Sequence, residues 1–334
     1  MGEVPEVALL PIREVSVVVP VYRSAETVRS LVDELATTLD QCAARWEVIL
    51  VDDGSPDGSW GAVRAATKDV PHVIGLRLMR NYGQHNALLA GIRAARYGIT
   101  ITLDDDLQNP PGEIPKLISK LEQGHDVVYG VPAHEQHQAW RMLASQATKF
   151  ALKEALGAGA TVRDISAFRA FHTRLRDAFA TFDSPFVSVD VLLTWGAKSF
   201  VAVSVEQRSR SAGESTYTFR KLVVHSFNMI TGFTTRPLQI ASIMGFACTV
   251  FGGAVLCAVL INYAIRGGTV PGFTFLASIV CLFSGAQLFA LGVIGEYLAR
   301  MHFRLMERPP YIVGESTVVV SAEHSPTDDG DRTP

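Results

Sequence analysis

The stretch Ile99-Thr100-Ile101-Thr102-Leu103-Asp104-Asp105-Asp106-Leu107-Gln108 joins a short apolar run directly to a cluster of carboxylates. The run predicts a β-strand, with the carboxylates at its C-terminal end. Open α/β sheets bind ligands at the carboxyl ends of their strands. Clustered carboxylates offer the hard oxygen ligands that Mg²⁺ and Mn²⁺ prefer, and water and phosphate oxygens usually complete the metal's shell. The stretch therefore predicts an α/β fold with a metal site and a phosphate-bearing substrate.

Apolar runs alternate with amphipathic segments through the first 130 residues. The pattern predicts strands at 15–19, 47–51, 73–78, 99–103 and 126–129, and helices at 27–39, 59–67 and 86–96. Such alternation is typical of a doubly wound, mostly parallel sheet. A helix is also predicted at 140–156, and further elements at 187–193 and 200–205.

Three polar clusters follow predicted strands, namely Asp52-Asp53, residues 80–86 and residues 104–108. All should gather on one edge of the sheet, and a carboxylate after the second strand commonly accepts hydrogen bonds from a ribose or base. Alone, Asp52-Asp53-Gly54-Ser55 is more typical of a turn that caps a helix. Combined with the later carboxylates, it favours nucleotide binding.

Two stretches without any charged residue, 237–265 and 267–295, are separated only by Arg266. About 20 apolar residues span a bilayer, so each stretch can cross once. The turn signal at 267–272 predicts a hairpin with spans at about 238–264 and 273–296. Two buried helices of a soluble core are the alternative, although core helices seldom run this long without charge.

Basic residues flank the outer ends of the hairpin, while its loop has Arg266 alone. The positive-inside rule therefore predicts a multi-pass protein of the cytoplasmic (inner) membrane, with both termini and the α/β domain in the cytoplasm. We expect no signal peptide, since residues 1–11 lack a basic region and a long apolar core. The net charge of −3 gives no reason to expect nucleic acid as a partner. The four cysteines have neither metal-site nor disulfide spacing.

Several motifs carry a resemblance to glycosyltransferase family 2, whose nucleotide-sugar-binding fold is called GT-A. They are Pro20-Val21-Tyr22, residues 51–58 and residues 104–111. Within that family the chain resembles polyprenyl-phosphate glycosyltransferases, such as dolichyl-phosphate mannose synthase and the undecaprenyl-phosphate glucosyl- and aminoarabinose transferases. The segments that support this are 80–87, 213–217, 295–298 and 308–311.

The resemblance implies a role for each matching residue. Mg²⁺ or Mn²⁺ would be held by Asp104, Asp106 and Gln108. The nucleotide sugar would be bound by Pro20, Tyr22, Asp52, Asp53, Asn81, Gln84, Asp104 and Asp105. The phosphates of donor or lipid acceptor would lie near Arg210, Ser215 and Tyr217. The candidate catalytic residues are Asp106, Asp164 as an orienting carboxylate or weak base, and Arg169 near the acceptor. For Arg210 and Arg169, a solvated surface position is the alternative.

Three positions depart from the family pattern. Ser24 stands where many relatives have Glu, Thr216 where many have Lys, and Ala167 where some have a suspected base, Asp. The acceptor tolerates a missing base, because a phosphate monoester with a second pKa near 6 is largely anionic at neutral pH. A metal on the diphosphate would stabilise the leaving group.

The expected domains are an extension at 1–13, a GT-A domain at 14–215, a juxtamembrane amphipathic helix at 216–236, the hairpin at 237–300 and a tail at 301–334, disordered after about 320. The amphipathic segment could lie in the membrane interface or pack on the catalytic domain. A homo-oligomer is possible, since some relatives are tetramers.

The predicted function is an inverting transfer of sugar from a nucleotide sugar, with UDP-sugar favoured, to undecaprenyl or decaprenyl phosphate in the bilayer. The product would donate sugar to a cell-envelope glycan or glycolipid. A GDP-mannose-dependent mannose synthase is the alternative, and a non-catalytic membrane scaffold is the alternative of another class. A processive synthase would need a Gln-x-x-Arg-Trp motif, and a transporter would need intramembrane charge.

Overall fold

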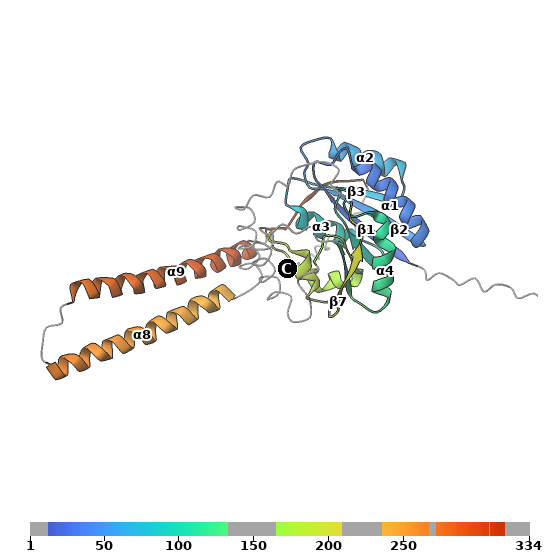
Figure 1. Ribbon diagram of the computed structural model, residues 1–334. Helices are drawn as coiled ribbons and strands as arrows, with labels where there is room; N and C mark the ends of the chain where they lie inside the picture. Colours follow the sequence, from blue (N-terminus) through green and yellow to red (C-terminus); the bar gives the residue numbers. More distant parts are fainter. Residues whose placement is uncertain (1–12, 133–164, 209–235, 267–271, 307, 318–334) are drawn as a thin grey trace, which may run out of the picture.

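The structure is a computed structural model that describes residues 13–132, 165–208, 236–266, 272–306 and 308–317. An eight-stranded sheet forms the centre of the α/β part, in the order β7-β5-β6-β4-β1-β2-β3-β8 (Figure 1). The strands are β1 (Glu14–Val21), β2 (Arg45–Asp52), β3 (Val73–Leu78), β4 (Ile99–Thr102), β5 (Val127–Pro132), β6 (Arg169–His172), β7 (Phe200–Val205) and β8 (Val313–Ser316).

The first four strands are parallel, as the sequence predicts. β1 pairs with both β2 and β4, and β2 pairs with β3. Apolar side chains of β1 are buried on both faces, with Val17 in one core cluster and Val18 in the other. A strand covered on both sides needs apolar residues at every position, which explains its unbroken valine run. The carboxyl ends of these four strands therefore share one edge.

Helices cover both faces of the sheet. One face packs against α1 (Val28–Cys42), α2 (Ser59–Asp69) and α4 (Ile114–Glu122), with the short 3-10 helix η1 (Pro111–Glu113) beside α4. The other packs against α3 (Gln84–Ala94), α6 (Val189–Leu193) and the 3-10 helix η3 (Thr173–Phe179). The fold is a three-layer, GT-A-like α/β structure, as predicted.

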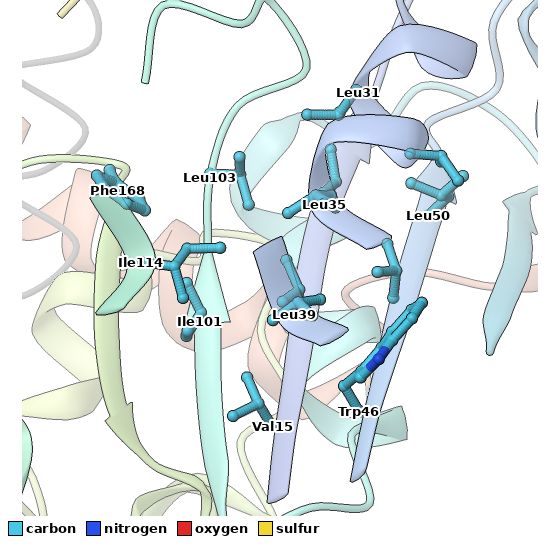
Figure 2. Packing of buried hydrophobic residues seen from close by; sticks show 14 of the residues in the cluster. Val15, Leu31, Leu35, Leu39, Trp46, Leu50, Ile101, Leu103, Ile114 and Phe168 are labelled. Carbon is cyan, nitrogen blue, oxygen red and sulfur yellow. The ribbon is translucent and has the colours of Figure 1, made fainter. Parts of the chain in front are cut away.

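Helix α1 shows how the sequence pattern creates this packing. Leu31, Leu35 and Leu39 recur every four residues, so they share one face of the helix. Figure 2 shows these side chains over the sheet, near Val15 and Leu50. All are fully buried, and burial of such a side chain contributes about 1.5–3 kcal/mol.

Two short strands run against the rest and were not predicted. β6 is antiparallel between β4 and β5, and β8 is antiparallel to β3 at the sheet edge. Each has only four residues, too few for a reliable alternation pattern. β8 comes from the region predicted to be a tail. The strand predicted at 200–205 is confirmed, and α6 lies within 187–193. The helix predicted at 140–156 falls outside the described residues, as does the amphipathic helix predicted at 216–236 except for its last residue.

Two long apolar helices, α8 (Arg236–Arg266) and α9 (Phe273–Leu305), run side by side away from the sheet (Figure 1). They cover the predicted spans, and α9 continues beyond the predicted end at 296. Leu238–Ile265, with a mean hydropathy of 2.3, has the length and composition to cross a membrane, whereas the second apolar stretch, Phe283–Ala299, is shorter. Many large side chains are exposed along both helices, among them Ile243, Phe246, Leu260 and Leu288.

Candidate active site

The three predicted polar clusters meet at the carboxyl ends of β1 to β4. The Asp53 carboxylate, after β2, accepts hydrogen bonds from the N–H groups of Tyr82 at 2.7 Å and Gly83 at 2.8 Å, after β3. Gln84, at the start of α3, donates from Nε2 to Oδ1 of Asp104, after β4, at 2.5 Å. The clusters are therefore linked by direct hydrogen bonds, and the prediction that they share one edge is confirmed.

Gly54 permits the close approach of the first two clusters. Its φ is +63°, a left-handed conformation that glycine adopts without strain. A Cβ at this position would lie 2.4 Å from the carbonyl carbon of Arg80. The glycine therefore lets the loop after β2 pack directly on the backbone of the loop after β3.

Residues 104–108 form a tight turn, here called the acidic turn. Leu107 has a φ of +58°, and Oδ1 of Asp106 accepts the N–H of Gln108 at 3.1 Å. Oδ2 of Asp105 accepts the N–H of Tyr22 at 3.2 Å, and burial raises the pKa of this carboxyl. Asp105 thus ties the turn to the end of β1, and its predicted contact with a nucleotide stays a prediction.

Asp52 is the most buried carboxylate at this edge, with no exposed surface. Its Oδ1 accepts the N–H of Ser55 at 3.3 Å, and burial raises its pKa. Its Oδ2 accepts no hydrogen bond among the described residues, although Nε of Arg77 lies 3.4 Å away in a poor geometry. A buried oxygen without a donor is uncommon, and a ligand donor at this point would satisfy it.

Arg77 itself was not predicted. The parallel register of β2 and β3 places it opposite Asp52. Only that register reveals the pair, because the two residues are 25 positions apart and share no motif.

The other predicted nucleotide contacts lie around the same edge. Pro20 is buried at the end of β1, and Tyr22 follows with 42% of its surface exposed. Asn81 is exposed on the loop after β3. These positions are compatible with the predicted roles, which stay predictions.

Arg169 occupies a buried position within the sheet. It lies in β6, is 1% exposed, and forms an ion pair with Asp190 of α6. Its Nε donates to Oγ1 of Thr102 at 3.0 Å, and the Tyr129 hydroxyl donates to Asp190 at 3.1 Å. Burial lowers the pKa of Arg169, but Asp190, Tyr129 and Asp104 together raise it by more, so the guanidinium stays charged. We call Thr102, Tyr129, Arg169 and Asp190 the buried cluster.

This burial excludes the solvated surface position considered for Arg169. Its predicted catalytic role near the acceptor is not tested by these contacts. Asp190 was not predicted, since no motif in the sequence marks it.

The acidic turn suits a divalent cation. Asp104, Asp106 and Gln108 are half-buried and offer carboxylate and amide oxygens. No cluster of three or more His, Cys, Asp or Glu side chains arranged to hold a metal occurs in the described part of the chain. Mg²⁺ is usually held by only one or two carboxylates, with substrate phosphates and water completing its shell. The donor set therefore fits a metal that is bound together with a diphosphate.

Four predicted residues, Asp164, Arg210, Ser215 and Tyr217, lie outside the described residues. Arg208 lies just before three of them. Its N–H donates to the carbonyl oxygen of Gln108 at 2.9 Å, and its guanidinium pairs with Glu34 at 2.9 Å. The chain therefore leaves the described part beside the acidic turn.

Comparison with known proteins identifies the family. The family model described as Glycosyl transferase family 2 matches residues 16–180, which run from within β1 to beyond β6 and include the acidic turn. A curated undecaprenyl-phosphate 4-deoxy-4-formamido-L-arabinose transferase of Shewanella sediminis is 36% identical over 313 residues, covering 91% of this chain and 94% of that protein. The chain belongs to glycosyltransferase family 2. It is therefore a glycosyltransferase, as the motifs predict.

Other relatives of the same name extend over almost the whole chain. The protein of Yersinia pestis is 34% identical over 320 residues, which cover 94% of this chain and 96% of its own length. Among solved structures, glucosyl-3-phosphoglycerate synthase of Mycobacterium tuberculosis, in a complex with Mn²⁺, UDP-glucose and phosphoglyceric acid, is 19% identical. That similarity covers 66% of this chain and 78% of the synthase, with a TM-score of 0.48.

Proposed function

We propose that this glycosyltransferase moves a sugar from a nucleotide sugar to a polyprenyl phosphate at the cytoplasmic face of the inner membrane. The observation that carries the proposal is that relatives named as undecaprenyl-phosphate transferases match nearly the whole chain, including the helices α8 and α9. A transferase with a water-soluble acceptor would not need these helices. A polyprenyl phosphate lies in the bilayer, so its transferase has to be held at the membrane.

The exposed apolar surface of α8 and α9 supports a membrane location. Monomeric soluble proteins rarely expose large contiguous apolar patches. A hairpin that crosses the bilayer twice, with its basic flanks in the cytoplasm, would keep the catalytic domain at the level of the lipid phosphate. Arg208, which bonds to Gln108 of the acidic turn, is followed by Arg210, Arg220 and Lys221, and this basic segment would face the headgroups.

For the donor, a UDP-sugar is favoured and GDP-mannose is the alternative. Both bases have ring N–H donors. Oδ2 of buried Asp52, which accepts no hydrogen bond among the described residues, could accept from either base, so this oxygen supports a nucleotide without deciding which one. The formamido-arabinose of the named relatives is the first sugar to test.

The chemistry needs positioning more than proton removal. The acceptor phosphate is largely anionic at neutral pH, so its oxygen can attack without a strong base. Attack opposite the leaving diphosphate inverts the anomeric carbon. Asp104, Asp106 and Gln108 would hold Mg²⁺ or Mn²⁺, which when bound stabilises the negative charge of the leaving diphosphate. Asp164 could orient the acceptor, and Arg210, Ser215 and Tyr217 could contact phosphates.

The test is transfer from labelled UDP-sugars and from GDP-mannose to undecaprenyl phosphate, with the purified full chain in nanodiscs and Mn²⁺ or Mg²⁺. We expect a labelled lipid product with an inverted anomeric centre, and loss of product in excess EDTA. Activity that persists in excess EDTA would contradict the proposed requirement for a divalent metal. Absence of product with every donor would favour the alternative that the chain is a non-catalytic membrane scaffold.

A further inference from the structure

The chain returns to the catalytic sheet after the apolar helices. β8 follows α9 and pairs antiparallel with the edge strand β3, with Arg77 opposite Glu315. The N–H of Thr317 donates to the carbonyl of Gly75 at 2.9 Å, and the N–H of Met79 donates to that of Ile312 at 3.0 Å. The end of the described chain is thereby fixed to β3, whose carboxyl end belongs to the edge where the polar clusters meet.

This pairing places a carboxylate between two donors. Oε1 of Glu315 accepts from Nη1 of Arg77 at 2.8 Å, and Oε2 accepts from Nε1 of Trp60 at 3.0 Å. The hydrogen bonds from Arg77 and Trp60 lower the pKa of Glu315, so the carboxylate is charged at neutral pH. The Arg77 guanidinium also lies 5.9 Å from the centre of the Trp60 ring. Arg77 is thus held by an ion pair from β8 and by an aromatic face from α2.

The other side of the same guanidinium faces Asp52. Nε of Arg77 lies 3.4 Å from Oδ2 of Asp52, the buried oxygen that accepts no hydrogen bond among the described residues. Arginine has many rotamers, and a side chain already fixed in one of them loses less entropy when a ligand binds. Glu315 therefore restricts the position of the cation that is paired with Asp52.

We propose that Arg77 and Glu315 are positioning residues for the nucleotide: Glu315 holds Arg77 against Asp52, and Arg77 keeps that carboxylate oriented for the nucleotide. This inference rests on the proposed function, in which Asp52 contacts the nucleotide. In this proposal β8, which comes after the apolar helices in the chain, contributes Glu315 as a positioning residue of the donor site.

The experiment is calorimetric titration of the detergent-solubilised full chain with UDP and with GDP in Mn²⁺, using the nucleotide that the wild type binds. Arg77→Met should raise Kd about 10-fold, the usual size of a lost contact to a charged group. Glu315→Gln should raise it about 3-fold, because the ion pair is half-exposed. The double variant Arg77→Met/Glu315→Gln should match Arg77→Met alone, since Glu315 acts through Arg77.

Two controls separate positioning from docking of the strand. Thr317→Val removes the hydrogen bond that Oγ1 accepts from the N–H of Gly75 at 2.8 Å, so it weakens β8 without touching Arg77. Arg64→Met removes a cation that acts on Glu315 only through its charge. Both should leave Kd within about 2-fold of the wild type, a change smaller than one weak surface ion pair.

Three outcomes would overturn the proposal. They are an unchanged Kd in Arg77→Met and Glu315→Gln, additive effects in the double variant, and an equal effect of Thr317→Val. A wild type that binds neither nucleotide would overturn the proposed function, and this inference with it. A wild type that binds while both variants bind equally well would overturn the inference alone.

Discussion

The acidic turn and the buried cluster place charged side chains close together in one sheet and use them in opposite ways. In the turn, Asp104 and Asp106 are half-buried at the strand edge. In the buried cluster, Asp190 receives an ion pair from Arg169 and a hydrogen bond from Tyr129. A buried charge has to be paired within the fold, whereas carboxylates gathered at the strand edge suit a cation or phosphate-bearing ligand.

The largest expected effect tests the acidic turn. Asp106→Asn should lower turnover about 100- to 1,000-fold, because the site loses a ligand of the metal that would stabilise the negative charge of the leaving diphosphate. Thermal unfolding should change little, since the side chain is half-buried. Transfer assays and melting curves of the full chain would measure both.

The matched control for this variant is the neighbouring Asp105→Asn. Its amide oxygen can still accept the N–H of Tyr22, so activity should stay within about 10-fold of the wild type, the cost of one hydrogen bond. Equal losses in both variants would contradict the division of roles within the turn.

The second effect tests the buried cluster. Arg169→Met should destabilise the fold by about 3 kcal/mol, because it leaves the Asp190 carboxylate buried without its cation. The double variant Arg169→Met/Asp190→Leu should cost much less, since no buried charge is left unpaired. Melting temperature is the measurement. A variant that melts normally but loses activity would instead support the catalytic role predicted for Arg169.

A third variant tests how the loop after β2 reaches the site. Gly54→Ala should destabilise by about 2 kcal/mol, because alanine is strained at a φ of +63° and its Cβ would meet the Arg80 backbone. Gly61→Ala in α2 is the control. Nothing lies within 4 Å of its Cβ position, so alanine should stabilise by about 0.5–1 kcal/mol. If both variants changed the free energy of unfolding in the same direction, the close approach of the loop after β2 to the Arg80 backbone would be contradicted.

The smallest expected effect is a pH dependence of the stability of the fold, caused by the titration of Asp53. Burial raises the pKa of this carboxyl above its ordinary value of 3.8, although two backbone N–H groups oppose the shift. As the pH falls, the folded chain binds this proton before the unfolded chain does. The stabilisation that this proton contributes is fully present below about pH 3.8. It is lost as the pH rises through the pKa of Asp53 in the folded chain.

Asp53→Asn removes this titration and is the variant to compare. The stability advantage of the wild type over Asp53→Asn should be larger near about pH 4 than near about pH 7. Melting temperatures across that range would show it, with Asp69→Asn on the exposed end of α2 as control. An advantage that grows as the pH rises would mean that the pKa is lowered instead.

Several elements could be predicted because their signals are local. The apolar runs of β1 to β4 and the four-residue spacing of Leu31, Leu35 and Leu39 depend only on neighbouring residues. The gathering of Asp53, Gln84 and Asp104 followed from the rule that parallel strands share a carboxyl edge. The family motifs then named the reaction class, and the comparisons confirmed it.

Other features needed the folded chain. β6 and β8 are too short to carry a pattern, and Asp190 and Glu315 stand in no motif. The pairing of Arg77 with Asp52 depends on strand register, and that with Glu315 joins residues 238 positions apart. The sequence by itself determined the segments of β1 to β5 and β7 and where the polar residues collect, because periodicity is a local property. Only the tertiary structure decided which charges are paired, because pairing depends on register and burial between distant segments.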